Sequence, residues 1–120
     1  MWGGFESRKF PRVKTDCSIF IKQVNGGRVI SAATENIGTG GICVILNEPL
    51  QKFSKIKMEL NLTDGEMPIS CDGRVAWIVP SRDFLTEKLT HDTGIEFVNL
   101  PEPARGRIER AVKLGRGSHQ

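Results

Sequence analysis

Tyrosine is absent from the 120 residues of this chain, and histidine occurs only twice. Neither His91 nor His119 has a cysteine or a second histidine at the spacing of metal ligands, which argues against a metal centre or a histidine-based catalytic site. The glycines at 38–41 lie between two expected strands and do not open a helix, so they match neither a phosphate-binding loop nor a dinucleotide fingerprint. We therefore expect no enzyme and no cofactor.

Long apolar runs are also missing. No run approaches the roughly 18 residues that cross a bilayer, and the N-terminal MWGGFESRKF has no stretch of the signal-peptide kind. Cysteine is scarce: Cys17, Cys43 and Cys71 are odd in number, far apart and each set in an apolar alternation. This pattern predicts reduced, buried thiols. The length predicts one domain, and we expect a cytoplasmic protein without membrane insertion.

The net charge of +3 is unevenly distributed. Residues 1–14 carry four basic and one acidic side chain (+3), and residues 105–120 carry five and one (+4). Residues 15–104 carry eight basic and twelve acidic side chains (−4). Two basic ends on a mildly acidic body favour a local anion site over the basic stripe that a nucleic acid requires. Charge alone, however, favours two solvated, frayed ends over such a site.

From residue 16 onward, runs rich in Val, Ile and Phe alternate with Gly, Asn and Asp, which predicts an all-β chain. The clearest alternation, from Lys55 to Leu62, is typical of a half-buried strand. Asn25-Gly26 and Asp64-Gly65 are tight-turn sequences between strands. Residues 80–90 are polar and are predicted to form a loop. Six strands are expected, at about residues 17–24, 28–34, 42–46, 55–62, 69–79 and 93–98.

One apolar run and two aromatic residues carry further predictions. The run from Ile42 to Leu46 is apolar throughout, which predicts a strand that is buried on both faces or that crosses a barrel corner. Trp77 and Phe97 share the parity of aliphatic neighbours in their strands, which predicts both rings in the core.

Only in the C-terminal part does the spacing of the apolar residues change from that of a strand to that of a helix. Ala104, Ile108 and Val112 recur at helical spacing, with Pro103 suited to the first turn and Gly115 to the C-terminal cap. A short amphipathic helix is therefore expected. Its basic residues near the C-terminus complement the helix dipole.

Two short segments carry the candidate chemistry. Residues 8–12 read Arg-Lys-Phe-Pro-Arg before the first strand, and residues 36–41 read Asn-Ile-Gly-Thr-Gly-Gly after the second. Together they resemble the PilZ domain family. That family has an Arg-x-x-x-Arg motif in an N-terminal segment and an Asp-or-Asn-x-Ser-x-x-Gly motif after its second strand. Arg8 and Arg12 match the first motif.

The resemblance extends from about residue 6 to residue 114. The segments 73–77 and 93–97 resemble the sequences that are usual in the fifth and sixth strands of the family. The resemblance implies a six-stranded antiparallel β-barrel with a short C-terminal α-helix. It also implies that the protein acts as a stand-alone cyclic di-GMP sensor. The implied division is a flexible ligand-binding segment at 1–15, the barrel and helix at 16–114, and a disordered tail at 115–120.

The chemistry of cyclic di-GMP fits these segments. Each guanine presents O6 and N7 as paired acceptors that an arginine fork matches with two hydrogen bonds. Pro11 stiffens a segment that must curve around the ligand, and a glycine-rich turn lets backbone approach it closely. The candidate ligand-binding residues are Arg8, Lys9, Arg12, Asn36, Gly38, Thr39, Gly40 and Gly41.

One position departs from the family pattern: Gly38 stands where serine is usual. The missing hydroxyl removes a hydrogen bond worth about 1 kcal/mol, or about fivefold in affinity. Thr39 is no obvious substitute, because neighbouring side chains in an extended segment face opposite ways. We expect weakened binding.

Three functions remain open. In the first, cyclic di-GMP orders the N-terminal segment against the barrel, and an unidentified effector protein reads the new surface. As the resemblance implies, motility, adhesion or exopolysaccharide production would be regulated. In the second, a degenerate PilZ adaptor acts by protein contact without nucleotide. The third, a small nucleic-acid-binding barrel, is disfavoured because the strands lack an exposed aromatic row, and no DNA or RNA partner is expected.

Overall fold

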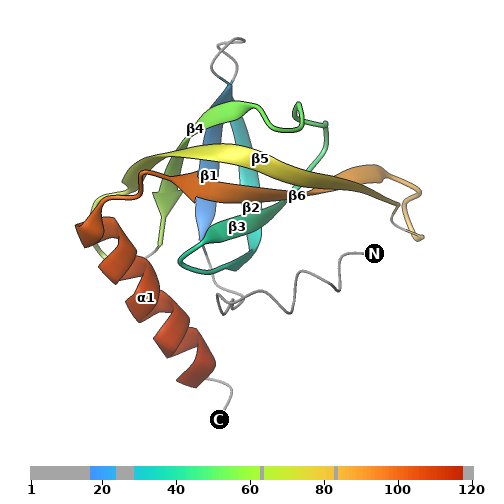
Figure 1. Ribbon diagram of the computed structural model, residues 1–120. Helices are drawn as coiled ribbons and strands as arrows, with labels where there is room; N and C mark the ends of the chain where they lie inside the picture. The colour runs from blue at the N-terminus through green and yellow to red at the C-terminus, as the bar shows by residue number, and fades with distance from the viewer. Residues whose placement is uncertain (1–16, 24–28, 63, 83, 118–120) are drawn as a thin grey trace.

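The computed structural model describes residues 17–23, 29–62, 64–82 and 84–117, and this part of the chain folds into six strands followed by one helix (Figure 1). The elements are β1 (Ser18–Gln23), β2 (Val29–Ile37), β3 (Gly41–Leu46), β4 (Lys55–Asn61), β5 (Ile69–Arg82), β6 (Leu89–Val98) and α1 (Glu102–Gly117). The predicted fold class, an antiparallel β-barrel with a C-terminal helix, is confirmed.

The strands form a ring in the order β1-β2-β3-β6-β5-β4, and β4 pairs back with β1. All six pairings are antiparallel. Four of them join strands that follow one another in the chain. The β1–β4 and β3–β6 pairings close the ring over long sequence separations, which satisfies the backbone donors and acceptors of what would otherwise be sheet edges.

Alternation along the strands fills the barrel. In β4, Ile56, Met58 and Leu60 are buried, whereas the residues between them are exposed. Ile19 and Ile21 of the neighbouring β1 are fully buried in the same core. Burying one such side chain contributes about 1.5–3 kcal/mol, so truncating Leu60 to alanine should cost about 2–5 kcal/mol.

Helix α1 lies against one end of the barrel (Figure 1). Its predicted apolar face is the buried one, because Ala104, Ile108 and Val112 belong to the same hydrophobic cluster as the strands. The helix extends to Gly117 and does not end at Gly115, where a cap was predicted. No helix in the described residues is long and apolar enough to span a membrane.

The predicted loop at 80–90 is strand at both of its ends. Strand β5 continues to Arg82 and β6 begins at Leu89, so the two form a ribbon that projects beyond the barrel at the right of Figure 1. A ribbon with no face against the core requires no apolar alternation, so the sequence pattern gave no sign of it. Phe84 and Leu85 follow β5 at its tip, each 96% exposed.

Candidate functional site

A β-bulge in β2 determines which way Asn36 faces. Thr34 pairs with the core residue Val44 of β3. Asn36 pairs with the residue before it, Cys43, so Glu35 is the extra residue of the bulge. Because an inserted residue re-aims the side chains that follow it, Asn36 lies on the outer face of the barrel wall and not on the inner face with Thr34.

A second bulge, in β5, does the same for Trp77. Val75 pairs with the core residue Ile95, and Trp77 pairs with Gly94, which leaves Ala76 as the extra residue. Trp77 is only 7% exposed but is not part of the core cluster. The prediction that this ring is buried is confirmed, but the bulge turns it to the outer face of the wall, outside the main core cluster. The prediction for Phe97 is confirmed, since this ring packs against the core.

The two bulges align residues of four strands in one row. Asn36 of β2 pairs with Cys43 of β3, Cys43 pairs with Gly94 of β6, and Gly94 pairs with Trp77 of β5. The indole lies over Gly94, where a Cβ atom would overlap the ring. Asn36 thus stands at one end of an outer-face row whose other end is aromatic.

The residues after Asn36 form a tight connection to β3. The Gly38 N–H donates to the Gly41 carbonyl at 2.9 Å, and the Phe97 N–H of β6 donates to the Gly40 carbonyl at 3.1 Å. Gly38 and Gly41 are buried, while Thr39 and Gly40 are half-buried. Backbone hydrogen bonds to β3 and β6 therefore hold the 36–41 segment in place.

Gly41 has a structural reason to be glycine. A Cβ atom there would overlap the carbonyl oxygen of Ile95 on β6 and would lie 3.2 Å from the Cα of Glu96. Both are backbone atoms, so they cannot move without displacing the strand. The close β3–β6 approach therefore requires Gly41 independently of any ligand.

Helix α1 contacts the 36–41 segment through Arg105. One guanidinium nitrogen of Arg105 donates to the Thr39 carbonyl at 3.5 Å, across 66 positions of sequence. The sequence pattern does not indicate this contact, because the helix dipole is a sufficient explanation for the basic residues of the helix.

Arg107, two residues further along α1, anchors the helix to the turn between β4 and β5. It donates to both carboxylate oxygens of Asp64, at 3.0 and 2.8 Å, and to the Met67 carbonyl at 2.8 Å. The hydrogen bond from Arg107 lowers the pKa of Asp64 and raises that of Arg107. The neighbouring Gly65 has a φ of 82°, as the predicted Asp-Gly turn requires.

The three cysteines are free. Cys17 and Cys43 are buried, and Cys71 is half-buried against the core. Burial raises the pKa of Cys17, and burial together with the charge of Asp72 raises the pKa of Cys71 to about 11. The prediction of reduced, buried thiols agrees with these positions.

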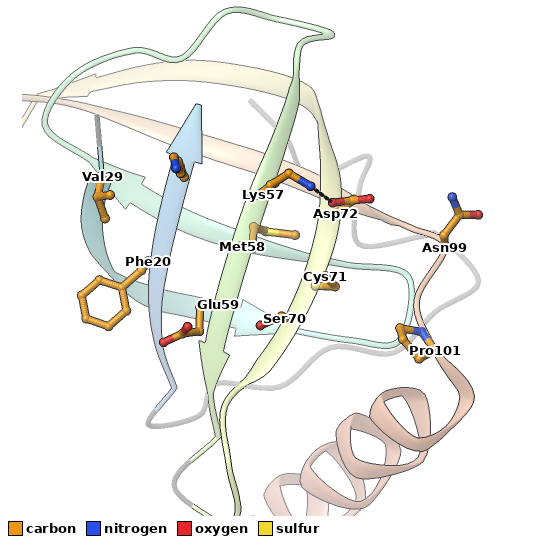
Figure 2. Close-up of a pocket in the computed structure, with 11 residues that line it drawn as sticks. Phe20, Val29, Lys57, Met58, Glu59, Ser70, Cys71, Asp72, Asn99 and Pro101 are labelled. Carbon is orange, nitrogen blue, oxygen red and sulfur yellow. Dashed lines mark hydrogen bonds and ion pairs between the residues drawn. The ribbon is translucent and has the colours of Figure 1, made fainter. Parts of the chain in front are cut away.

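A pocket of about 590 Å³ lies on a different part of the barrel (Figure 2). It is lined by residues of β1, β2, β4 and β5, and Phe20 and Val29 are exposed along it. The charged residues that line it include a Lys57–Asp72 pair at 3.4 Å. No residue of the 36–41 segment lines it, so this pocket is separate from the candidate site.

The predicted site is therefore seen in part. Asn36, Gly38, Thr39, Gly40 and Gly41 are together in one short connection. The other predicted residues, Arg8, Lys9 and Arg12, lie outside the described residues.

The family comparison agrees with this barrel. The model of the PilZ domain matches residues 6–114, nearly the whole chain. The chain belongs to the PilZ domain family. The resemblance inferred from the two motifs is thus confirmed at the level of the family. No curated protein sequence matches the chain.

Solved PilZ structures share the fold at low sequence identity. The PilZ domain of YcgR from Escherichia coli, solved with c-di-GMP, superposes with a TM-score of 0.76 at 14% identity, over 94% of each chain. The c-di-GMP complex of MrkH from K. pneumonia gives 0.76 at 18% identity, over 94% of this chain and 55% of MrkH. The inhibitor of motility MotI/DgrA of Bacillus subtilis gives 0.74 at 17%, over 94% and 53%.

The PilZ domain described here therefore spans about half the length of the MrkH and MotI chains. The motifs give no indication of Arg105, which contacts the 36–41 segment, or of Trp77, which lies in the same outer-face row as Asn36. The bulge that turns Trp77 outward and the docking of the helix that carries Arg105 both depend on contacts between elements, which local sequence patterns do not specify.

Proposed function

We propose that this PilZ domain is a cytoplasmic cyclic di-GMP sensor in which the segment carrying Arg8 and Arg12 folds over a nucleotide bound at residues 36–41. The observation that carries the proposal is the bulge at Glu35, which turns the motif residue Asn36 outward beside a backbone-rich connection. Family membership and the nucleotide complexes of YcgR and MrkH support the choice of ligand.

Chain geometry supports contact between the two motifs. The Thr34 N–H donates to the Cys17 carbonyl at 3.2 Å, so the start of the barrel lies two residues from Asn36. Arg12 precedes Cys17 by five residues, which allows a reach of at most about 17 Å. An arginine fork at that distance can bind a guanine edge or a phosphate beside Asn36.

Isothermal calorimetry with cyclic di-GMP tests the proposal. We expect saturable binding at roughly tens of micromolar or tighter, weakened about tenfold or more by Arg12→Ala, because hydrogen bonds to charged groups are the stronger ones. Lys52→Ala, on an exposed turn between β3 and β4, is the control and should bind normally. Absence of heat with both the native chain and the Arg12 variant would refute the proposal.

In this proposal, a partner protein converts nucleotide binding into a regulatory response. Phe84 and Leu85, at the tip of the β5–β6 ribbon, are apolar side chains almost wholly in water, which is typical of contact surfaces. We propose that the effector binds this tip and that motility, adhesion or exopolysaccharide production is regulated. Replacing both residues with serine should abolish regulation in cells while leaving nucleotide binding unchanged. Normal regulation by that variant would exclude the tip.

A second candidate function is a PilZ adaptor that binds its partner without nucleotide. The observation favouring it is Gly38, which contributes only backbone groups where a hydroxyl is usual. The same calorimetry distinguishes the two, because an adaptor of this kind gives no binding with either Gly38 or Gly38→Ser.

A further inference from the structure

Two arginines on the first half of α1 differ sharply in how their hydrogen-bonding groups are used. Arg107 makes a forked pair with Asp64 and a third bond to the Met67 carbonyl, all between 2.8 and 3.0 Å. Arg105 makes one long bond of 3.5 Å, to the Thr39 carbonyl. A guanidinium carries five N–H donors, so within the described residues most of the donors of Arg105 are available.

Arg105 also has no carboxylate partner within the described residues, although it is half-buried. A charge is expensive to hold away from water without a counter-ion, and its attraction to an incoming anion is correspondingly stronger there than in bulk solvent. The site therefore favours an anion that arrives with a ligand.

Its position in the helix is unfavourable for a cation. The Arg105 N–H donates to the Pro101 carbonyl, which places the residue in the first turn of α1. The positive end of the helix dipole lies at this turn, where acidic residues are stabilising and basic ones are not. Helix stability alone therefore gives no reason for an arginine at this position.

The group that Arg105 contacts belongs to the predicted binding segment. Thr39 follows Gly38 directly, and the next carbonyl, that of Gly40, is held by Phe97 of β6. A nucleotide phosphate seated on this connection would lie within reach of a guanidinium that already contacts its backbone.

We propose that Arg105 is a third ligand-binding arginine, supplied by helix α1, which pairs with a phosphate oxygen of the dinucleotide bound at residues 36–41. This inference rests on the proposed function. It assigns the helix a part in ligand binding that neither sequence motif contains.

Calorimetry with cyclic di-GMP on four proteins tests the assignment: the native chain, Arg105→Ala, Arg105→Lys and Arg110→Ala. Arg110 is an exposed arginine on the same helix and is the matched control. We expect Arg105→Ala to weaken binding about tenfold or more and Arg110→Ala to leave it unchanged. Arg105→Lys should retain most of the affinity, because a lysine still serves a phosphate as a point charge.

Each other outcome overturns the assignment in a distinguishable way. Native affinity in Arg105→Ala would show that Arg105 does not contact the ligand, and it would leave the proposed function intact. A loss as large in Arg105→Lys as in Arg105→Ala would indicate a guanine edge, which needs the arginine fork, and would refute the phosphate contact. Absence of binding by the native chain would refute both proposals. Urea unfolding of each variant separates lost affinity from lost folding, and the lysine variant preserves the charge if the alanine variant fails to fold.

Discussion

The indole of Trp77 covers Gly94 so closely that a Cβ atom on Gly94 would overlap both the ring nitrogen and the adjoining ring carbons. The contact lies on the outer face of the barrel wall and is produced by the bulge at Ala76. It fixes the position of an aromatic side chain in the same row as Asn36.

Gly94→Ala should therefore destabilise the barrel by about 1–3 kcal/mol, the usual cost of inserting an extra methyl group into a packed site. Gly106→Ala is the control, because a Cβ there meets only the far end of Arg110, at 3.8 Å. In a helix that change should stabilise by up to about 1 kcal/mol. Urea unfolding measures both, and equal midpoints for the two variants would contradict the contact.

Gly41→Ala should also reduce stability, by about 1–3 kcal/mol or more, because its methyl group would meet the backbone of Ile95. Unfolding midpoints should fall whether or not nucleotide is present. If Gly41→Ala instead lost nucleotide affinity at an unchanged midpoint, the glycine would serve the ligand and not the β3–β6 packing.

The Asp64–Arg107 pair should make the attachment of α1 sensitive to acid. The pKa of Asp64 is lowered from its usual 3.8 by the hydrogen bond from Arg107, so the folded state binds this proton less tightly than the unfolded state. The stabilisation is present above pH 3.8 and is lost as the pH falls through the lower pKa of the folded state.

Asp64→Asn should accordingly lower the unfolding midpoint at neutral pH and have little effect in strong acid. Lys57→Ala breaks the exposed pair with Asp72 and should cost only about 0–1 kcal/mol at any pH. A pH-independent effect of Asp64→Asn would rule out the forked pair as the source of the stability.

Cys71 should resist alkylation at neutral pH. Burial raises its pKa to about 11 from the usual 9.0, so the reactive thiolate is rare in the folded protein. The folded state binds this proton more tightly, so the associated stability is complete below pH 9.0 and declines as the pH rises towards 11. Iodoacetamide labelling followed by mass spectrometry should find slow modification of Cys71 that accelerates in urea. Rapid labelling of the folded protein would contradict this burial.

Gly38→Ser should tighten cyclic di-GMP binding about fivefold by restoring one hydrogen bond. Gly38 has no positive φ, so serine introduces no backbone strain there. Calorimetry measures the change. Thr39→Ser alters the adjacent side chain and should leave the affinity near its native value. Tighter binding by Thr39→Ser but not by Gly38→Ser would contradict the prediction that the missing hydroxyl belongs at position 38.

Local patterns in the sequence were sufficient to predict most of the barrel. The alternation from Lys55 to Leu62 predicted β4 and the side it buries, and the helical spacing of Ala104, Ile108 and Val112 predicted the buried face of α1. These are properties of neighbouring residues, so a single sequence contains them.

Register and long-range contacts could not be predicted in this way. The bulges at Glu35 and Ala76 depend on how one strand meets another, and each reverses the side on which the following residue lies. For that reason alternation predicts that Trp77 is buried but not that it lies outside the main core cluster. The contact between Arg105 and Thr39 depends on the path of the chain between β6 and α1, which no local pattern specifies. Arg8 and Arg12 remain predictions from a motif.

The β5–β6 ribbon also bears on self-association. The register between β4 and β5 ends at Arg74, so the last part of β5 pairs along its length with β6 alone. Pro80, which offers no N–H to an incoming strand, lies in this stretch, and Arg82 adds a charge at its end. Both are common protections of exposed edges against aggregation. The ribbon thus leaves its apolar tip exposed while discouraging the pairing of one copy with another.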